Sequence, residues 1–300
     1  MNCLVVGGAG FIGSNLVDKL IDEGHKVLVI DNLSTGKREN INEEADFIEA
    51  DIANAWEEIR ITIDKIDVVF HLAAMARVQP SIENPLAFNQ VNVNGTLNLL
   101  QACVDNKVKR FVFSSSSSVY GDAKELPTKE NTELNPMSPY ALQKLIGEQY
   151  CKLFSDLYDI ETVSLRYFNV YGERQSLEGA YCLVMGKFAQ QKLNGEPMTI
   201  RGDGEQKRDF TYVGDVVDAN IKAATNENIG KGEIFNIGNG DNHSVNQLAD
   251  MIDGDTVNVD PVVEPKETLA DNTKAKEILD WKPKTKIETW IKKYKKELGI

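Results

Sequence analysis

The sequence is poor in the residues from which metal centres and disulfide frameworks are built. Its 300 residues include three histidines and four cysteines. The cysteines lie far apart and form no Cys-x-x-Cys pair; they are Cys3, Cys103, Cys151 and Cys182. This spacing argues against a zinc site and favours free thiols in a reducing cytosol, with no bound metal.

Long apolar runs and a surplus of positive charge are also missing. No run reaches the roughly 18 residues of a transmembrane helix, and no basic region precedes the short apolar run of MNCLVVGGAG, as it would in a signal peptide. A net charge of −13 disfavours a nucleic-acid backbone as a partner. We therefore expect a cytoplasmic protein with neither membrane nor nucleic-acid partners.

Short apolar runs alternate with helical patterns along the first half of the chain. Nearly continuous apolar character is typical of strands that are covered on both faces. The alternation predicts an α/β fold with a doubly wound parallel sheet of the Rossmann type. The expected strands are residues 2–6, 26–30, 46–50, 67–73, 110–114 and 162–168, and the expected helices are 12–23, 86–105 and 139–158.

Three glycines mark the junction of the first strand and the first helix. In LVVGGAGFIG, Gly7, Gly10 and Gly13 let the backbone approach a pyrophosphate, and the helix N-terminus supplies N–H donors. The motif alone also fits an ordinary tight turn. Its position, together with Asp31 at the end of the second strand, favours a dinucleotide site.

Asp31 indicates NAD rather than NADP. A carboxylate at this strand end accepts hydrogen bonds from ribose hydroxyls and repels a 2′-phosphate. Lys37 and Arg38 lie nearby and would serve a phosphate, but Asp31 stands at the strand end itself. Asp51 and Ile52 follow the third strand and are candidates for the adenine pocket, with a simple turn aspartate as the alternative.

The regular alternation ends near residue 170. We therefore predict an NAD-binding Rossmann domain over residues 1–170 and a smaller α/β substrate-binding domain over residues 171–300. The β-rich segment at 233–238 is a candidate strand of the Rossmann sheet. Residues 287–300 have an amphipathic pattern whose lysines indicate a solvated helix face.

Tyr140 and Lys144 share one face of the helix expected from residue 139. A phenol with an ordinary pKa of ~10 is a poor base at neutral pH unless a nearby ammonium favours the phenolate. Lys144 stands four residues further on, which places it to do so. Such pairs are common on helix surfaces, but this one follows a dinucleotide-type half-domain, and we interpret it as catalytic.

The run SSSSS at 114–118 follows the fifth strand directly. A flexible spacer does not ordinarily continue a buried strand, and ligands of open α/β sheets bind at the carboxyl ends of strands. A hydroxyl in this place polarises a carbonyl or an alcohol beside the tyrosine. Some of the five serines fit equally well as partners of the loop backbone.

Motifs over nearly the whole chain resemble those of one family. GGAGFIGSNL, HLAAMARVQPSIENP, SSSSSVYG, SPYALQK, LRYFNVYG and GDGEQKRDFTYVGDV occur in this order. The chain resembles the extended short-chain dehydrogenase/reductases, and within them the UDP-glucose 4-epimerase branch. The resemblance implies tightly held NAD, a transient 4-keto sugar, and a homodimer that pairs through helices of the large domain.

The resemblance also assigns roles to residues. It makes Tyr140 the base, with Ser116 and Lys144 as its catalytic partners. The cofactor contacts that it implies are Gly7, Gly10, Phe11, Ile12, Gly13, Asp31, Asn32, Asp51, Ile52, Leu72, Ala73, Ala74, Ala76, Ser114, Tyr140, Lys144 and Phe168. The implied contacts to the nucleotide sugar are Ser116, Asn169, Leu183, Arg201, Arg208 and Thr268.

Several positions depart from the family pattern. Ser118 stands where related dehydratases and decarboxylases carry an acid, which favours simple epimerisation. The family's diphosphate arginine is absent from PVVE at 261–264, and Lys266 and Arg201 are candidate replacements. Thr268 is small at the gate of the sugar pocket, so UDP-N-acetylhexosamines are expected as substrates beside UDP-hexoses.

Two other functions remain as alternatives. One is an enzyme for another nucleotide sugar, dTDP- or GDP-linked, either an epimerase or a reductase that releases its cofactor. The other is a nucleotide-sensing binding protein on the same fold. The complete set of Tyr140, Lys144 and Ser116 speaks against a sensor, which has no chemical need of all three.

Overall fold

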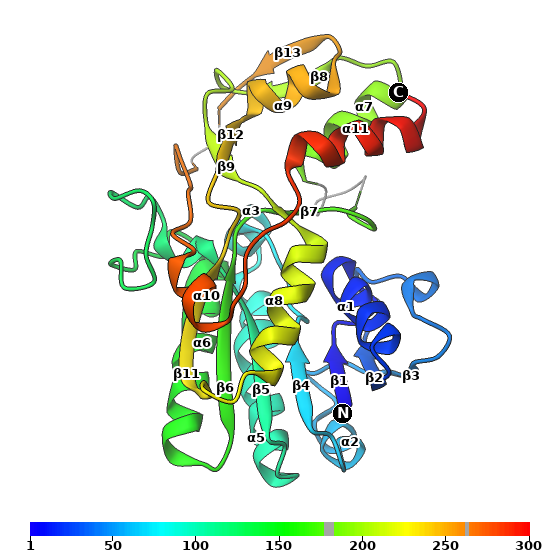
Figure 1. Ribbon diagram of the computed structural model, residues 1–300, viewed down its shortest axis with the longest axis vertical. Coiled ribbons are helices and arrows are strands. Elements are labelled where there is room, and N and C mark those ends of the chain that lie inside the picture. The colour runs from blue at the N-terminus through cyan, green and yellow to red at the C-terminus, as the bar shows by residue number, and fades with distance from the viewer. Residues whose placement is uncertain (177–182, 262–263) are drawn as a thin grey trace.

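A seven-stranded sheet forms the centre of the molecule in a computed structural model that describes residues 1–176, 183–261 and 264–300 (Figure 1). Its strand order is β11-β6-β5-β4-β1-β2-β3, and each neighbouring pair is parallel. The doubly wound α/β sheet expected from the sequence is confirmed. The strands are β1 (Asn2–Val6), β2 (Lys26–Asp31), β3 (Asp46–Glu49), β4 (Val68–His71), β5 (Arg110–Ser116), β6 (Glu161–Tyr167) and β11 (Lys231–Ile237).

Helices cover both faces of the sheet, and each layer encloses its own buried cluster. On one face α1 packs against α8, where Leu16 and Val216 belong to the same cluster. On the other face lie α2, α5 and α6, whose cluster includes Leu100 and Phe154. The bounds of these helices are α1 (Phe11–Asp22), α8 (Val213–Thr225), α2 (Trp56–Thr62), α5 (Thr96–Asp105) and α6 (Pro139–Leu157).

The helix expected over residues 86–105 is interrupted by a wider turn. The helix α4 (Pro85–Asn89), the π-helical turn η2 (Gln90–Gly95) and α5 follow one another directly. Asn92 of η2 accepts a hydrogen bond from the backbone N of Met75 and donates to Met75 O and Gln143 Oε1, each at 2.9 Å. Such turns are frequent at functional sites. Here one amide ties the segment after β4 to helix α6.

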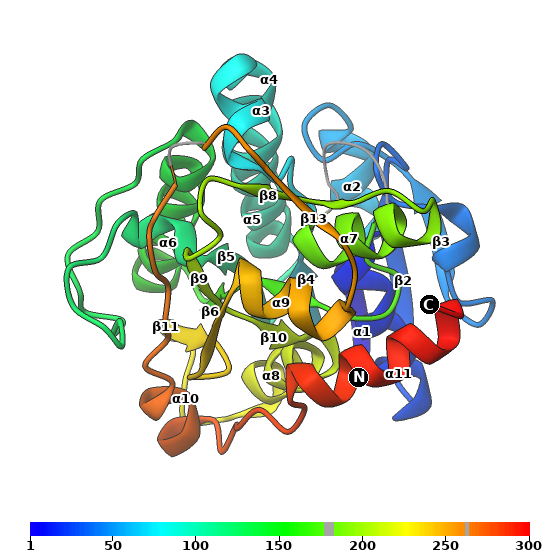
Figure 2. The same cartoon turned by 90° about the horizontal axis from the view of Figure 1, so that it is seen from above.

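A smaller unit lies above the carboxyl ends of the sheet strands (Figures 1 and 2). Its buried cluster includes Phe188, Leu248 and Trp290. Its short strands pair β7 with β10 and β8 with β13 in parallel, and β9 with β12 antiparallel. The elements are β7 (Val170–Tyr171), α7 (Val184–Leu193), β8 (Met198–Arg201), β9 (Lys207–Asp209), β10 (Thr211–Tyr212), β12 (Asn242–Ser244), α9 (Val245–Ile252), β13 (Thr256–Val259) and α11 (Ile287–Leu298).

Short helices complete the chain, and the sheet reaches well beyond residue 170. The strand β11 pairs with β6, so the segment near 233–238 does lie in the main sheet. The boundary at residue 170 stays a prediction.

No helix among the described residues is both long and apolar enough to span a membrane. The remaining helices are η1 (Arg38–Asn40), α3 (Val78–Glu83), η3 (Ser117–Tyr120) and α10 (Thr273–Ile278).

The expected thiols can be placed for three of the four cysteines. Cys3, Cys103 and Cys151 are free and buried. Cys182 lies outside the described residues. Burial raises the pKa of the Cys3 thiol to about 11, which keeps it protonated and unreactive at neutral pH.

Candidate active site

A cavity of about 2130 Å³ lies where the carboxyl ends of the sheet strands face the smaller unit. In open α/β sheets this edge is where ligands bind. Every residue that the sequence assigned to the cofactor, the substrate or catalysis lines this one cavity. The structure therefore brings the whole set together, while the role of each residue stays a prediction.

The glycine turn after β1 leaves no room for side chains. Gly7 has a φ of +86°, and a Cβ there would lie 2.6 Å from the backbone N of Ala73. A Cβ at Gly13 would lie 2.1 Å from the carbonyl oxygen of Gly7. The helix α1 begins at Phe11, and no side chain caps its N-terminus. Free N–H groups at a bare helix end fit the pyrophosphate of a dinucleotide.

Asp31 closes β2 with its carboxylate held by the backbone. Its Oδ2 accepts from the backbone N of Ala9 at 3.0 Å, and its Oδ1 accepts from that of Leu33 at 2.8 Å. Burial raises the pKa of this carboxyl, and the two N–H groups oppose the rise. Asn32 Nδ2 donates to Asp51 Oδ2 at 3.3 Å on the same side of the cavity. These side chains fit the ribose and adenine end of NAD.

Tyr140 stands in the first turn of α6. Ser138 caps that helix, and the backbone N of Tyr140 donates to Ser81 Oγ of α3 at 3.2 Å. Burial raises the pKa of the Tyr140 phenol, while a hydrogen bond with the Ser116 side chain and the positive charge of Arg77 oppose the rise. Ser116 and Tyr140, which the sequence analysis paired, line the same cavity.

Lys144 is fixed one turn further along α6. Its Nζ donates to the carbonyl of Ser114 at 2.7 Å and lies 6.0 Å from the centroid of the Tyr140 ring. Burial lowers the pKa of Lys144 to about 8, and interactions with Cys151 and Glu148 oppose the fall. The ammonium is therefore held in place, but close to losing its proton under mildly alkaline conditions.

Sequence reasoning missed Arg77, the cation that acts on Tyr140. It lies after β4, precedes α3 as its N-terminal flanking residue, and lines the cavity. The sequence-based expectation gave the role of favouring the phenolate to Lys144 alone. The signal that could have found Arg77 is a charged residue that follows the small and apolar segment LAAMA (72–76), which itself comes directly after a buried strand.

A buried polar network supports the serine run from behind. Ser115 Oγ donates to Glu148 Oε1 at 2.5 Å. Arg166 pairs with both oxygens of Glu148, at 2.8 and 2.7 Å, and its Nη1 donates to Tyr120 Oη at 2.7 Å. Glu148 is 3% exposed and Arg166 is 1% exposed. This network fixes the end of β5 against β6 and α6.

The far end of the cavity carries the residues assigned to the nucleotide sugar. Arg208 Nη2 forms an ion pair with Glu264 Oε2 at 2.6 Å. Thr268 Oγ1 accepts from the backbone N of Asp209 at 3.3 Å, so its small side chain is engaged at the cavity wall. Of the two candidate replacements for the missing arginine, Arg201 lines the cavity and Lys266 does not. Residues 262 and 263 lie outside the described residues.

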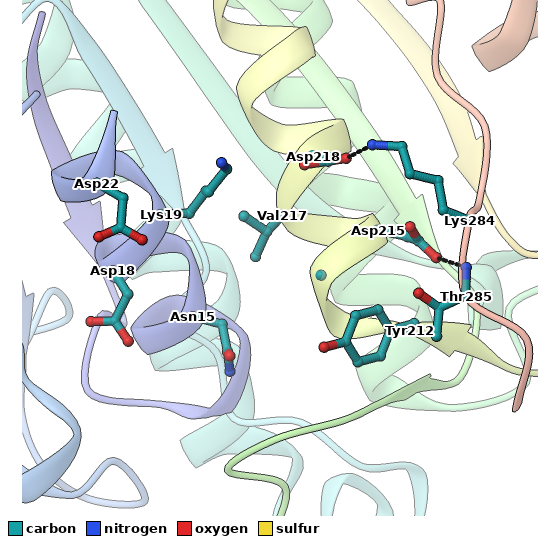
Figure 3. Close-up of a pocket in the computed structure, with 11 residues that line it drawn as sticks. Asn15, Asp18, Lys19, Asp22, Tyr212, Asp215, Val217, Asp218, Lys284 and Thr285 are labelled. Atoms are coloured by element: carbon teal, nitrogen blue, oxygen red, sulfur yellow. Dashed lines mark hydrogen bonds and ion pairs between the residues drawn. The ribbon is translucent and has the colours of Figure 1, made fainter. Parts of the chain in front are cut away.

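A separate surface pocket of about 370 Å³ lies between α1 and α8 (Figure 3). Asp218 pairs with Lys284 at 2.5 Å, and Asp215 Oδ2 accepts from the backbone N of Thr285 at 3.1 Å. Asp18 pairs with Arg174 at 2.6 Å. None of the residues assigned to cofactor, substrate or catalysis lines this pocket. The residues assigned to catalysis therefore lie in the large cavity and not in this pocket.

The fold and the large cavity define a dinucleotide-dependent enzyme of the doubly wound α/β class. Residues 3–238 match the model of the "NAD dependent epimerase/dehydratase family". The chain belongs to this family, as its resemblance to the extended short-chain dehydrogenase/reductases implied, and its cofactor is NAD.

Similar proteins carry 4-epimerase names. A putative UDP-glucose 4-epimerase of Methanocaldococcus jannaschii is 42% identical over 97% of this chain and 96% of its own length. The solved UDP-glucose 4-epimerase of Thermotoga maritima with UDP-glucose is 40% identical, with a TM-score of 0.93 over 99% of this chain and 100% of that chain. The UDP-N-acetylglucosamine 4-epimerase of Methanobrevibacter ruminantium, in complex with UDP-N-acetylmuramic acid, is 41% identical with a TM-score of 0.91, over 97% and 95%.

Proposed function

We propose that the protein interconverts UDP-sugars that differ in configuration at carbon 4. The substrates that we propose are UDP-glucose and UDP-galactose, and also UDP-N-acetylglucosamine and UDP-N-acetylgalactosamine. The observation that carries the proposal is that Ser116, Tyr140 and Lys144 line one cavity together with the dinucleotide turn, with Lys144 Nζ 6.0 Å from the centroid of the Tyr140 ring.

In the proposed reaction, the proton and the hydride that leave the sugar both return to it. As a phenolate, Tyr140 removes the proton of the 4-hydroxyl when carbon 4 loses a hydride, and it returns a proton to the same oxygen when the ketone is reduced on its other face. When bound, NAD supplies the acceptor and donor of that hydride. Ser116 donates a hydrogen bond to the oxygen on carbon 4, and the Lys144 ammonium favours the phenolate.

The far end of the cavity supports a diphosphate-linked sugar. Arg208 offers a planar guanidinium that can pair with two phosphate oxygens. Asn169 lines the cavity beside it and donates from Nδ2 to Asp209 O at 3.3 Å. The small Thr268 leaves room for a 2-acetamido group, which is the basis for including the N-acetylhexosamines.

Ser118 supports epimerisation over dehydration or decarboxylation. Those reactions need further proton transfers, and related enzymes carry an acid in this place. Ser118 Oγ is buried and has no hydrogen-bond partner among the described residues. A hydroxyl without a general acid's pKa cannot take over the role of that carboxylate.

The proposal is tested by the product formed without added reductant. The purified protein is incubated with UDP-, dTDP- and GDP-hexoses and with UDP-N-acetylglucosamine, and the sugar signals are followed by NMR. We expect the 4-epimers of the UDP-sugars to appear. If only a dTDP- or GDP-sugar were epimerised, UDP would be the wrong nucleotide. If the sugars bound but none was converted, the result would favour a nucleotide-sensing binding protein.

We also propose a cytoplasmic homodimer that pairs through α6. An apolar stripe with helical spacing runs along the outer side of this helix, and Leu142, Leu153 and Leu157 in it are 47%, 48% and 64% exposed. A dimer would cover this stripe. Leu153→Lys with Leu157→Lys should give a monomer in light scattering, whereas Leu193→Lys on α7, a comparably exposed leucine, should not. A monomeric wild-type protein would contradict the proposal.

A further inference from the structure

Gln175 carries a buried carboxamide whose Nε2 and Oε1 have no hydrogen-bond partner in the part of the chain that the structure describes. The residue is 7% exposed, and it lines the large cavity. A buried amide without partners costs free energy, so a native protein ordinarily provides a protein group, a water or a ligand for it. Gln175 is not among the residues that the sequence assigned to the cofactor or the substrate.

The residues just before Gln175 are fastened to the first helix of the sheet unit. Asn15 of α1 donates from Nδ2 to the carbonyl of Phe11 at 2.8 Å and to that of Glu173 at 3.1 Å. The Arg174 side chain pairs with Asp18 of the same helix at 2.6 Å. Figure 3 shows Asn15 and Asp18 on α1. The backbone that leads into Gln175 therefore lies against the first two turns of this helix.

The side chain of Glu173 ties the same segment to the smaller unit. Its carboxylate accepts from Tyr212 Oη at 2.8 Å and from Trp290 Nε1 of α11 at 3.2 Å. The backbone N of Gln175 donates to the carbonyl of Gly172 at 3.3 Å, which closes a turn. The carboxamide is thus held in place before any ligand binds, and a group fixed in this way loses little conformational entropy on binding.

The N-terminus of α1 opens into the same cavity as Gln175. Gly10 and Phe11 line the cavity, and no side chain caps the helix. Its unpaired N–H groups and its partial positive charge favour a diphosphate. Because Glu173 lies against this first turn, Gln175 stands on the side of the cavity where the helix begins. Two independent features therefore offer hydrogen bonds to a ligand there.

We propose that Gln175 is a further binding residue for NAD, with its carboxamide donating to the diphosphate of the cofactor and accepting from an adjoining ribose hydroxyl. A dinucleotide presents both kinds of group, and the carboxamide has both a donor and an acceptor to offer. Through the contacts of Glu173, the smaller unit contributes to the retention of the cofactor. The inference needs the NAD cofactor of the family but not the proposed reaction of the sugar.

The test replaces the carboxamide by an apolar group of the same length. Gln175→Met removes the donor and the acceptor, so bound NAD should exchange with isotopically labelled NAD at least about tenfold faster than in the wild type. Gln175→Glu keeps an acceptor but places a negative charge beside the diphosphate, and it should speed the exchange at least as much. Without NAD, Gln175→Met should unfold at a higher temperature than the wild type, because it buries no unpaired amide.

Gln190→Met is the matched control. Gln190 lines the same cavity, but its Nε2 already donates to Asn194 Oδ1 at 3.1 Å. This variant should leave the exchange of NAD unchanged. Exchange is measured without any sugar, so its outcome does not depend on the proposed reaction.

The other source of a diphosphate is the substrate, and calorimetry of UDP binding to the NAD-loaded protein tests it. We expect Gln175→Met to bind UDP as the wild type does. Weaker UDP binding with unchanged exchange of NAD would overturn the inference and assign Gln175 to the substrate. If neither exchange nor UDP binding changed, the inference would also be wrong, and a buried water would be the partner of the amide.

Discussion

Arg208 and Glu264 form an ion pair, 2.6 Å between Nη2 and Oε2, in the part of the cavity assigned to the diphosphate of the substrate. The Arg208 side chain is 12% exposed and that of Glu264 is 35% exposed. The carboxylate thus keeps a largely buried guanidinium oriented before the substrate arrives. In the proposed complex a diphosphate would replace one anionic partner of Arg208 with another, which avoids leaving a buried charge unpaired.

Replacing Arg208 should weaken binding rather than chemistry. Arg208→Gln removes the charge-assisted pair that we propose with the diphosphate, a group remote from the reacting carbon, so KM should rise about 30-fold while kcat changes less than about threefold. Steady-state kinetics and UDP binding by calorimetry measure this. Lys266→Gln is the comparison, because Lys266 does not line the cavity and should leave both constants unchanged. A fall in kcat at unchanged KM would mean that Arg208 acts near the reacting carbon rather than on the diphosphate.

Replacing Tyr140 should separate catalysis from cofactor binding. Tyr140→Phe removes the proposed base and keeps the ring, so turnover should fall by about a thousandfold or more. NAD should stay bound, because the glycine turn and Asp31 are untouched. The absorbance of nucleotide released on denaturation measures the bound NAD, and NMR measures turnover. Undiminished turnover would remove Tyr140 from the role of base.

The burial of Lys144 should appear in the pH dependence of stability. Its pKa is lowered from 10.5 to about 8, so the folded protein disfavours the ammonium, and the full cost is present below pH 8. Between these two values the folded state has released a proton that the unfolded chain retains, and stability therefore rises with pH. This rise of stability with pH is opposite in sign to the effect of a lysine that gains an ion-pair partner on folding, because the pKa of such a lysine is raised and its contribution to stability falls as the pH rises.

Lys144→Met isolates this effect. Relative to the variant, the wild-type free energy of unfolding should rise by about 2 kcal/mol from pH 8 to pH 9.5, because one proton is released earlier in the folded state. Denaturant unfolding of the NAD-free protein at several pH values measures it, and the difference between the two proteins cancels other titrating groups. A constant difference across this range would mean that Lys144 keeps its ordinary pKa in the fold.

Hydrophobic pattern and motif position predicted much of the fold and of the cavity. Residues 139–158 were expected as a helix and α6 spans Pro139–Leu157, because a serine cap, a proline in the first turn and a long apolar stripe all agree there. The six early strands lie within two residues of their expected ends. Strands such as β1 and β4 are buried on both faces, and such strands carry a nearly continuous apolar run.

Features that depend on contacts distant in sequence could not be predicted. The π-helical turn at Gln90–Gly95 is stabilised by Asn92 with Met75 and Gln143, which no local pattern reveals. The effect of Arg77 on Tyr140 likewise arises where the loop after β4 meets the start of α6. The ion pair that occupies Arg208 depends on Glu264, 56 residues further along the chain.

The Glu148 network should prove costly to break from one side only. Glu148→Gln leaves the guanidinium of Arg166, which is 1% exposed, without its counter-charge, and should lower the free energy of unfolding by about 3–5 kcal/mol. Adding Arg166→Met removes the unpaired charge and should restore part of that loss, since an apolar side chain tolerates the same surroundings. Urea unfolding of the single and the double variant measures both steps. A loss below about 1 kcal/mol in Glu148→Gln would show that Arg166 gains little from Glu148. A double variant less stable than the single one would show that Arg166 stabilises the fold through its hydrogen bonds to Tyr120 and Glu130 even without Glu148.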